Sequence, residues 1–520
     1  MKRIHLTSSL TPIVICILIS IAGFIFYIQT TEEGLWLTDD SILFVIGADS
    51  IIDGNGFSRI SGSGEVKPLT GFPPGYSSIL AIARFIGIDI YSFARWMNGL
   101  FYLGSVFLAG WLVHRITAST IASVICLLLI ITSRSFLSLH GWLMAEASFI
   151  FLIILGLVAL LLYVERKRRK LLIAAAILIG LSVMSRYTGL ALIPAFCLFL
   201  VFSSVKPWKR RVEDALIFGF LASLPFIALA LTNQAAAGSM VNREVSLLRL
   251  DLPVIATYIE EMFSWILPWN FIASIRLRYK ILSVVLLFVI LPGIPVVTQY
   301  RNDKRAQSNR KSARLLSLFP LIIVTYLLLI WYGISSLNPS RLHIQRYLEP
   351  IFILCTISIP STLAIFITRK KAWASLQILS LVFAGFIIAA SGYELYQTLV
   401  HFTPRLSEYQ RDELNATISN NIRSVGDDDP FITNEIYFVY FLINESTYQV
   451  PIYYNSYKDE VRADFERQLD VYWAMMSNGS YLILFDSIDQ QQPRFPPREI
   501  LTDGLTEVRS FEGGAIYSSK

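Results

Sequence analysis

Residues 11–57 read TPIVICILISIAGFIFYIQ, then TTEEGLWLTDD, then SILFVIGADSIIDGNGF. The first run is almost wholly apolar and has nearly the length of about 20 residues that a helix needs to cross a bilayer. An acidic pair, Asp39 and Asp40, follows about ten residues later, and a second, shorter apolar segment begins directly after it. The rest of the interpretation starts from this pattern, a membrane span leading into an acidic loop.

The composition of the whole chain is that of a membrane protein. Of its 520 residues, 54% are hydrophobic and only 16% are charged, whereas soluble domains carry roughly 25% charged residues. The net charge of +6 does not indicate nucleic-acid binding, because the basic residues form short clusters between apolar runs. The cysteines lie in apolar runs without metal-ligand spacing, and we expect them to be small buried side chains. They are Cys16, Cys126, Cys197 and Cys355.

Eleven apolar runs are predicted to cross the membrane as helices. The first follows Lys2 and Arg3 and lacks a small-residue cleavage site, so we expect an uncleaved span and not a signal peptide. The predicted spans are Thr11–Gln29, Tyr91–Val113, Thr120–Ser133, Gly141–Tyr163, Leu171–Ser185, Thr188–Ser203, Ala215–Thr232, Ile281–Thr298, Leu315–Ile334, Tyr347–Thr368 and Ala374–Tyr393.

Basic clusters between the runs predict the orientation, since loops rich in Lys and Arg stay cytoplasmic. The clusters are Lys2-Arg3, Arg115, Arg166–Lys170, Lys206–Arg211, Arg301–Arg314 and Arg369–Lys371. We therefore expect a cytoplasmic N-terminus and an extracytoplasmic C-terminal segment, in a multi-pass protein of the cell membrane. The predicted division is a membrane domain over residues 1–395, with outer loops at 30–90 and 233–280, and a soluble extracytoplasmic domain over 396–520.

Residues 396–520 differ in composition from the rest, with 19 of the 38 acidic residues against ten Lys and Arg. Their alternating periodicities predict a small α/β domain. The expected elements are helices at 406–424, 435–443 and 460–476, strands at 430–433, 448–453 and 481–485, and a strand pair near Glu507 and Ala515. The run Asp427, Asp428 and Asp429, directly before Pro430, is expected to be a solvated turn.

The acidic pair is the first candidate for chemistry. The segment after it is expected to be a short helix in the membrane interface, capped by Asp40 or Ser41. A carboxylate at the positive end of a helix, beside a second acid, is a candidate general base. The alternative is that one aspartate only caps the helix and the other is solvated.

The loop after this helix contains two groups of turn-forming residues. Gly54 and Gly56 come first, and Pro73 and Pro74 follow shortly before Tyr76 opens another apolar helix. We expect these turns to form a cavity rim, with ordinary loop punctuation as the alternative.

Two charged residues lie near the outer ends of predicted spans. Glu146, in HGWLMAEASFIFL, is expected to face a cavity or a partner, because ionisable groups in a membrane segment are costly. A water-exposed glutamate is the alternative. Arg186 lies at an outer hairpin turn, where it would pair with an acid or a phosphate, or simply extend to the interface.

The stretch SLNPSRLHIQRYLEP, residues 336–350, precedes the tenth predicted span. Asn338 is a plausible N-cap, and helical spacing then brings His343 near Arg346 and Tyr347, with Arg341 rotated away. Two guanidinium groups and a tyrosine at headgroup depth suit phosphate binding, because arginine presents a fork of donors that stays charged. The alternative is a boundary helix anchored by aromatic and basic residues.

Taken together, these features resemble the GT-C-fold membrane glycosyltransferases that use polyprenyl-phosphate sugars. The group includes protein O-mannosyltransferases, lipid A aminoarabinose transferases and rhizobial core transferases. The features that resemble the family are the acidic pair Asp39-Asp40, the turn Gly54, Gly56 and Phe57, the element Pro73, Pro74 and Tyr76, the acid Glu146, the outer Arg186, and Arg346, Tyr347 and Pro350. Their order and shared outer placement cover nearly the whole chain. The implied fold is a polytopic α-helical GT-C-like membrane protein with a small C-terminal α/β domain.

The resemblance also implies roles for these residues. Asp39 would be the base that deprotonates an acceptor hydroxyl as it attacks the anomeric carbon with inversion. Arg346, with Arg341, Tyr347 or Arg186, would bind the donor phosphate, and Glu146 would position the acceptor or share a divalent cation with the acidic pair. The sequence has Asp-Asp where several branches have Asp-Glu, so the choice between Asp39 and Asp40 stays open.

The expected function is transfer of a sugar from a polyprenyl-phosphate donor to a hydroxyl of a glycolipid, glycan or protein at the outer face of the membrane. No cofactor is required by the residues, although a divalent cation is possible. One alternative is an O-antigen ligase or polymerase, which predicts catalytic Arg and His in a large outer loop. Another is a transporter or flippase, which predicts charges at the membrane midplane.

Overall fold

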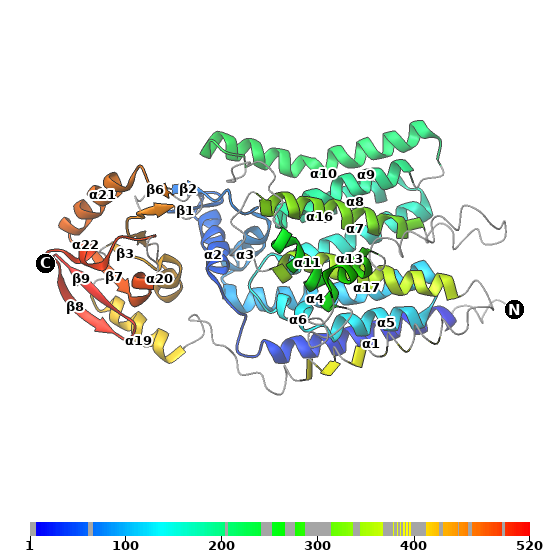
Figure 1. Ribbon diagram of the computed structural model, residues 1–520, viewed down its shortest axis with the longest axis horizontal. Coiled ribbons are helices and arrows are strands. Elements are labelled where there is room, and N and C mark those ends of the chain that lie inside the picture. The colour runs from blue at the N-terminus through cyan, green and yellow to red at the C-terminus, as the bar shows by residue number, and fades with distance from the viewer. Residues whose placement is uncertain are drawn as a thin grey trace.

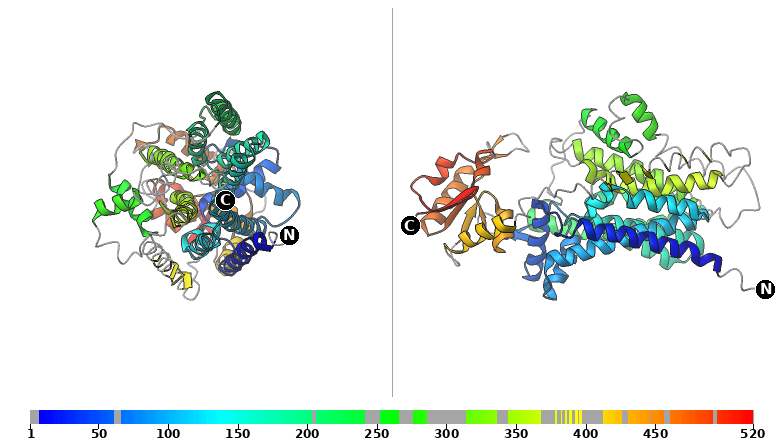
Figure 2. Two further views of the ribbon diagram at one scale, coloured as in Figure 1. Left: turned by 90° about the vertical axis from the view of Figure 1, so that its right-hand side faces the viewer. Right: turned by 90° about the horizontal axis from the view of Figure 1, so that it is seen from below.

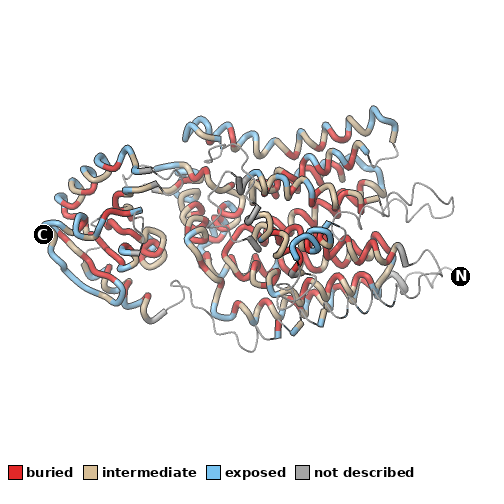
Figure 3. Tube along the Cα trace, in the orientation of Figure 1, coloured by how far each residue is buried: buried red, intermediate tan, exposed pale blue. Residues whose placement is uncertain are grey.

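The computed structural model describes residues 7–60, 66–202, 206–240, 252–265, 276–285, 314–335, 344–367, 412–425, 430–445, 447–455, 460–490 and 494–519, with isolated positions between 378 and 396. Figure 1 shows an elongated molecule with a helical bundle on the N-terminal side and a mixed sheet at the opposite end. Buried residues concentrate on the sides of the helices that face one another, while the outer faces of the bundle carry more exposed residues (Figure 3). Exposed apolar side chains on the bundle surface, such as Leu18, Phe220 and Leu231, fit contact with lipid.

The bundle contains the helices of a multi-pass membrane protein. Within the described ranges, six helices are long and apolar enough to cross a bilayer, or seven if a bent pair counts as one span. The helices of this part are α1 (Thr7–Thr30), α2 (Asp39–Ile52), α3 (Gly75–Phe85), α4 (Ile90–Thr117), α5 (Thr120–Ile131), α6 (Arg134–His140), α7 (Glu146–Arg166), α8 (Arg169–Ser185), η1 (Tyr187–Ala191), α9 (Leu192–Phe202), α10 (Trp208–Ala237), α11 (Leu252–Ser264), α13 (Leu277–Val284), η3 (Arg314–Ser317), α16 (Leu318–Ser335) and α17 (Ile344–Ile367).

The predicted spans match the helices unevenly. The first, second, seventh, ninth and tenth spans correspond to α1, α4, α10, α16 and α17. The predicted hairpin around Arg186 is present, as α8 followed by η1 and α9. The span predicted over 374–393 and most of the one over 281–298 lie outside the described residues, so the count of eleven stays a prediction.

Three boundaries differ from the sequence predictions. The connection expected over residues 133–140 is a helix, α6, bent by 63° from α5, because Ser133 caps a new helix through the Phe136 N–H. The span predicted from Gly141 begins instead at Glu146, which is therefore the first residue of α7. Helix α11 lies inside the segment predicted as the outer loop 233–280.

Of the cysteines, Cys197 is half-buried and the other three are buried.

A backbone bridge joins the start of the first outer loop to the turn before α7. The Trp36 N–H donates to the Gly141 carbonyl at 2.9 Å, and the Leu143 N–H donates to the Trp36 carbonyl at 3.0 Å. The indole rings of Trp36 and Trp142 pack edge to face. Asp40 lies four residues after one strand of this bridge and Glu146 four residues after the other, so the bridge brings the two acids to one place.

A buried polar group on α4 reinforces this junction. The Asn98 side-chain amide donates to the carbonyls of Trp142 at 2.8 Å and His140 at 3.2 Å, and it accepts from the Tyr76 hydroxyl at 3.2 Å. Tyr76 is fully buried. It therefore packs inside the bundle and anchors the turn before α7, instead of standing at a cavity rim as predicted.

The first outer loop forms a compact layer at one end of the bundle. Helix α2 lies crosswise at that end, between the long helices and the sheet, as both views show (Figures 1 and 2). The short strands β1 (Ser58–Ile60) and β2 (Val66–Pro68) pair antiparallel between α2 and α3. Gly54 and Gly56 adopt positive φ angles of 80° and 69°, which glycine tolerates without strain, so they make the turn after α2.

The C-terminal segment contains a mixed five-stranded sheet of order β4-β3-β7-β9-β8. Strand β3 (Phe431–Thr433) is parallel to β4 (Tyr448–Gln449) and β7 (Tyr481–Phe485), whereas β9 (Gly514–Ser518) is antiparallel to β7 and β8 (Thr506–Phe511). The other elements are α19 (Asp412–Arg423), α20 (Ile436–Ile443), β5 (Tyr454–Asn455), β6 (Glu460–Val461), α21 (Phe465–Ser477), η7 (Asp486–Gln490) and α22 (Arg498–Thr502). Most of these positions agree with the elements expected from the sequence, but the strand expected over 448–453 is only Tyr448–Gln449, and residues 460–461, expected to begin a helix, form β6. The acidic run 427–429 lies outside the described residues, and around the predicted boundary at 396 only isolated positions are described.

This segment docks on α2 and α3 through a polar cluster. Arg84 donates two hydrogen bonds to the Asp49 carboxylate, at 2.6 and 3.2 Å, and one to the Asn444 side chain at 3.2 Å. The Tyr440 hydroxyl of α20 also donates to Asp49. Burial and the Asp49 carboxylate both raise the pKa of Tyr440, so the phenol stays protonated and remains a donor. The cluster ties α20 to the helix that carries Asp40.

The start of α3 packs closely against the end of α8. A Cβ atom added to Gly75 would lie 2.4 Å from the carbonyl oxygen of Met184, two residues before Arg186. No side chain fits there without moving one of the two helices. This close approach explains why glycine follows the two prolines, Pro73 and Pro74, at the beginning of α3.

We predict that Gly75→Ala lowers the free energy of unfolding by about 1–3 kcal/mol, because the added methyl group overpacks the α3–α8 contact. Thermal unfolding of the purified protein in detergent measures this change. Gly71→Ala is the matched control, because nothing lies within 4 Å of its added Cβ. Equal melting temperatures for the two variants would contradict the close approach.

Candidate active site

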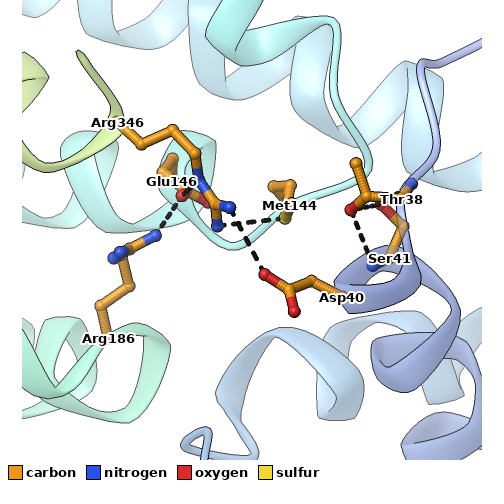
Figure 4. Close-up of polar contacts among 7 residues, drawn as sticks. All are labelled: Thr38, Asp40, Ser41, Met144, Glu146, Arg186 and Arg346. Carbon is orange, nitrogen blue, oxygen red and sulfur yellow. Dashed lines mark hydrogen bonds and ion pairs between the residues drawn. The ribbon is translucent and has the colours of Figure 1, made fainter. Parts of the chain in front are cut away.

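The candidate site is built around the buried carboxylate of Glu146. Its side chain is only 1% exposed, and its Oε1 atom accepts from Arg346 Nε at 2.7 Å and from Arg186 Nη1. Arg186 comes from the turn between α8 and η1, and Arg346 comes from the first turns of α17. One carboxylate thus holds two guanidinium groups from distant parts of the chain (Figure 4).

Arg346 connects this pair to the first outer loop. Its Nη1 atom lies 3.4 Å from Asp40 Oδ2, and its Nη2 atom donates to the Met144 sulfur at 3.4 Å. The Asp40 carboxylate points towards Arg346 in Figure 4. Asp40 is 36% exposed, so it combines a contact with a half-buried cation and access to solvent.

The N-terminus of α2 sets the direction of the acidic pair. The cap is Thr38, whose hydroxyl accepts from the Ser41 N–H while the Ser41 hydroxyl accepts from the Thr38 N–H. The prediction that Asp40 or Ser41 caps the helix is therefore wrong. Both aspartates lie in the first turn instead, where the helix dipole stabilises negative charge. The capping role is filled by threonine, so neither carboxylate is used for it.

The aromatic ring of Tyr347 packs against the Arg186 guanidinium. The Arg186 guanidinium lies over the Tyr347 ring at 5.3 Å from its centre, a geometry in which a cation is attracted to the aromatic face. Burial by itself would lower the pKa of Arg186, but the Glu146 carboxylate raises it above its ordinary value. Arg186 therefore keeps its positive charge.

The structure brings together five of the residues singled out in the sequence: Asp40, Glu146, Arg186, Arg346 and Tyr347. Asp39 lies beside Asp40 in the same helical turn. Arg341 and His343 lie outside the described residues. Pro73, Pro74 and Tyr76 do not line the cavity beside Glu146, which is formed by α6, the turn before α7, and Arg346.

Several residues of this site were not found from the sequence. Met144 contacts Arg346, and Ser135, Ser138 and Trp142 line the adjacent cavity. Small polar and aromatic residues near a helix end carry no distinctive sequence signal. The apolar pattern from Ser133 to Glu146 predicts a connection and the start of a span, and it gives no sign of the bend that creates α6.

The acidic side chains do not fit a shared divalent cation in this arrangement. Glu146 already pairs with two guanidinium groups, and Arg346 lies between it and Asp40. Across the described ranges, no group of three His, Cys, Asp or Glu side chains is placed to hold a metal ion. The cationic charge at this site comes from arginine.

Comparisons with known proteins agree with this architecture. A family model described as dolichyl-phosphate-mannose-protein mannosyltransferase matches residues 60–233, about a third of the chain, including Glu146 and Arg186. Apo ArnT from Cupriavidus metallidurans superimposes with a TM-score of 0.58 at 11% identity, over 98% of this chain and 97% of that one. The chain has the GT-C fold. The resemblance inferred from the sequence is thereby confirmed.

Two further solved structures share the fold. ArnT from the same organism bound to undecaprenyl phosphate gives a TM-score of 0.50 at 11% identity, over 97% of each chain. The oligosaccharyltransferase AglB from Archaeoglobus fulgidus, in complex with an inhibitory peptide and a dolichol-phosphate, gives 0.54 at 13% identity, over 92% of this chain and 69% of that one. No curated protein sequence matches the chain.

We predict that Glu146→Gln lowers the free energy of unfolding by about 3–5 kcal/mol, because the half-buried guanidinium groups of Arg186 and Arg346 lose the carboxylate that they share. Thermal unfolding in detergent measures the loss. Glu213→Gln is the matched control: Glu213 pairs with Arg169, but the two side chains are 45% and 61% exposed, so its loss costs about 0–1 kcal/mol. A Glu146→Gln protein as stable as the control would show that the buried network does not hold the site together.

Proposed function

We propose that the protein is an inverting membrane glycosyltransferase, which moves a sugar from a polyprenyl-phosphate donor to a hydroxyl of a glycolipid, glycan or protein. The observation that carries this proposal is the position of Arg346, 3.4 Å from the Asp40 carboxylate and 2.7 Å from that of Glu146. A fixed cation beside a solvent-accessible carboxylate suits a reaction in which a phosphate leaves while a hydroxyl loses its proton. The GT-C fold, shared with a structure that binds undecaprenyl phosphate, supports the same reaction.

In the proposed reaction, Arg346 and Arg186 bind the donor phosphate. The oxygen of the acceptor hydroxyl attacks the anomeric carbon from the face opposite the phosphate. The bond between that carbon and the phosphate oxygen breaks, and its electron pair leaves with the lipid phosphate. The hydroxyl proton passes to Asp40. The products are the glycosylated acceptor, the lipid phosphate and a protonated Asp40, which releases its proton to solvent.

The contact between Arg346 and Asp40 sets the order of the steps, with donor binding before activation of the base. At 3.4 Å it is long for a charge-assisted hydrogen bond, which is normally about 2.7–2.9 Å. A phosphate that approaches Arg346 competes for the same guanidinium and leaves the Asp40 carboxylate available to an acceptor. Donor binding would then activate the base. Glu146 holds the two arginines in place and takes no proton.

The choice of Asp40 over Asp39 rests on this contact. The family resemblance implies Asp39 as the base, whereas the Asp40 carboxylate lies 3.4 Å from the Arg346 guanidinium. Helical geometry turns neighbouring residues about 100° apart, so the two carboxylates leave α2 in different directions. We therefore propose Asp40 as the base.

The orientation in the membrane and the role of the C-terminal segment complete the proposal. The site lies at the end of the bundle that faces the C-terminal sheet, and the basic clusters place that end outside the cytoplasm. The N-terminus is then cytoplasmic and the C-terminal segment is a soluble domain that covers the site. A ligase that uses a pyrophosphate-linked glycan or a transporter is less well supported, because the charges gather at one end of the bundle around an acid-base arrangement.

We predict that Asp40→Asn reduces sugar transfer by about 10²–10⁴-fold, because the amide cannot accept the acceptor proton. The measurement is transfer of radiolabelled sugar from a polyprenyl-phosphate donor in membranes that contain the variant. Asp39→Asn is the matched control and should retain most activity. The reverse pattern would make Asp39 the base, and near-wild-type activity of both variants would refute the mechanism.

The substrates are best identified in a deletion strain. Mass spectrometry of its envelope glycans and polyprenyl-linked sugars should show one donor accumulating and one glycan lacking a residue. Complementation with the wild-type gene should restore both, and complementation with the Asp40→Asn variant should not. An unchanged glycan profile together with unchanged lipid-linked sugars would contradict the proposed function.

A further inference from the structure

A cavity of about 90 Å³ lies beside the ion pairs of the active site. Helix α6 contributes one wall, the turn before α7 a second, and Arg346 of α17 a third. The lining residues are Ser135, Ser138, Leu139, Trp142, Met144, Glu146 and Arg346. The cavity therefore opens next to the group that is proposed to bind the donor phosphate.

Glu146, which lines this cavity, has one oxygen without a hydrogen-bond partner among the described residues. Its Oε1 atom binds both guanidinium groups, whereas its Oε2 atom is buried and has no hydrogen-bond partner among the described residues. Buried polar atoms almost always have a partner, and leaving one without costs about 1–3 kcal/mol. The missing partner is a hydrogen-bond donor, which a molecule in the cavity would supply.

A second buried carboxylate, that of Glu349, contacts a residue that lines the cavity. Glu349 follows Arg346 by three residues on α17, so it lies on the same helix face, one turn away. It is 1% exposed, and its Oε2 atom accepts a hydrogen bond from the Ser135 hydroxyl at 2.8 Å. Its Oε1 atom has no partner in the described part of the chain. The proposed mechanism makes no use of this group.

Ser135 links Glu349 to the cavity. Because its only proton is donated to Glu349, the serine oxygen can act towards the cavity only as an acceptor. The Ser138 hydroxyl likewise donates its proton, to the Ser135 carbonyl at 3.0 Å, so towards the cavity its oxygen can only accept a hydrogen bond. Glu146, Ser135 and Ser138 therefore all offer acceptors. Trp142 adds an aromatic ring, and the Arg346 guanidinium adds donors.

Acceptor groups and an aromatic ring on one side, with a cation at the edge, match a sugar attached to a phosphate. The hydroxyl groups of a sugar ring, or an amino group on it, donate hydrogen bonds, and its C–H face packs on aromatic side chains. A carboxylate on the sugar would instead meet the acceptor oxygens of Glu146, Ser135 and Ser138, to which it cannot donate a hydrogen bond.

We propose that this cavity is the subsite for the transferred sugar, and that it takes a sugar with hydroxyl or amino donors and without a carboxylate. Glu349 is a positioning residue in this proposal, because it orients the Ser135 hydroxyl and does not touch the sugar. The inference rests on the proposed function, since it assumes a lipid-phosphate donor at Arg346. Beyond the proposed function, this inference specifies the class of sugar that the site selects and the residues that select it.

The test compares lipids that differ only in the sugar. Purified full-length protein in nanodiscs is titrated with undecaprenyl phosphate alone and with undecaprenyl phosphate that carries mannose, galactosamine or glucuronic acid. Wild-type protein should bind the mannosyl or the galactosaminyl lipid at least about tenfold more tightly than the bare lipid. It should bind the glucuronyl lipid no more tightly than the bare lipid.

Three variants separate the hydrogen bond from the charge. Ser135→Ala and Glu349→Met should reduce the preference for the sugar-bearing lipid about tenfold and leave affinity for undecaprenyl phosphate unchanged. Glu349→Gln keeps an acceptor for Ser135 without the charge, so it should keep this preference, and Glu146 should still exclude the glucuronyl lipid. Thr356→Val is the matched control in α17, because among the described residues the Thr356 hydroxyl bonds to the Ile353 carbonyl of its own helix.

The outcomes distinguish the two proposals. If wild-type protein binds undecaprenyl phosphate but shows no preference for any sugar, or prefers glucuronic acid, the subsite is wrong and the proposed function stands. If Ser135→Ala weakens the bare and the sugar-bearing lipids equally, Ser135 has only a structural role and the subsite is wrong. If wild-type protein binds none of these lipids, the proposed function itself fails.

Discussion

The carboxylate of Glu146 is the interaction on which the site depends. It is buried at the first residue of α7, and it holds Arg186 from the α8–η1 turn and Arg346 from α17. A buried carboxylate without a cation, or a buried guanidinium without an anion, costs several kcal/mol. The three segments are therefore stable only when they meet at this point. Their meeting places a cation 3.4 Å from Asp40, which belongs to a fourth segment.

The position of Asp40 depends on contacts that reach well beyond the site. The backbone bridge between Trp36 and residues 141–143 brings the outer loop to the start of α7, and Asn98 holds the same turn against α4. On its other side α2 is tied to the C-terminal segment by Asp49 and Tyr440. Helix α2 thus lies between the bundle and the sheet. The C-terminal segment therefore helps to hold α2 in place.

Much of this arrangement could be predicted from the sequence, and the failures have physical reasons. Apolar runs of sufficient length show the long helices, and an ionisable residue such as Glu146 in such a run indicates a function because its burial is costly. The pairing of Arg186 with an acid was one of the predicted alternatives, and Arg186 and Arg346 both bind Glu146. Alternating periodicity also located the strands around Ile432 and Ile483.

The predictions that failed concern features that depend on tertiary contacts, and such contacts leave no local signal in the sequence. Thr38 caps α2 because of the geometry of its pairing with Ser41, and a sequence with four polar residues in a row fits several caps equally well. Tyr76 is buried because Asn98, on another helix, accepts its hydroxyl. The bend between α5 and α6 follows from a serine cap inside an apolar stretch, which periodicity alone reads as one helix or as a connection.

We propose that Arg346, held by Glu146, joins the donor phosphate to the Asp40 carboxylate. The most direct test is an electron cryomicroscopy structure of the full-length protein with undecaprenyl phosphate in nanodiscs. We expect phosphate oxygens within hydrogen-bond distance of Arg346 and Arg186, with the Asp40 carboxylate released from Arg346 and open to solvent. A phosphate bound away from both arginines, with Arg346 still paired to Asp40, would contradict it.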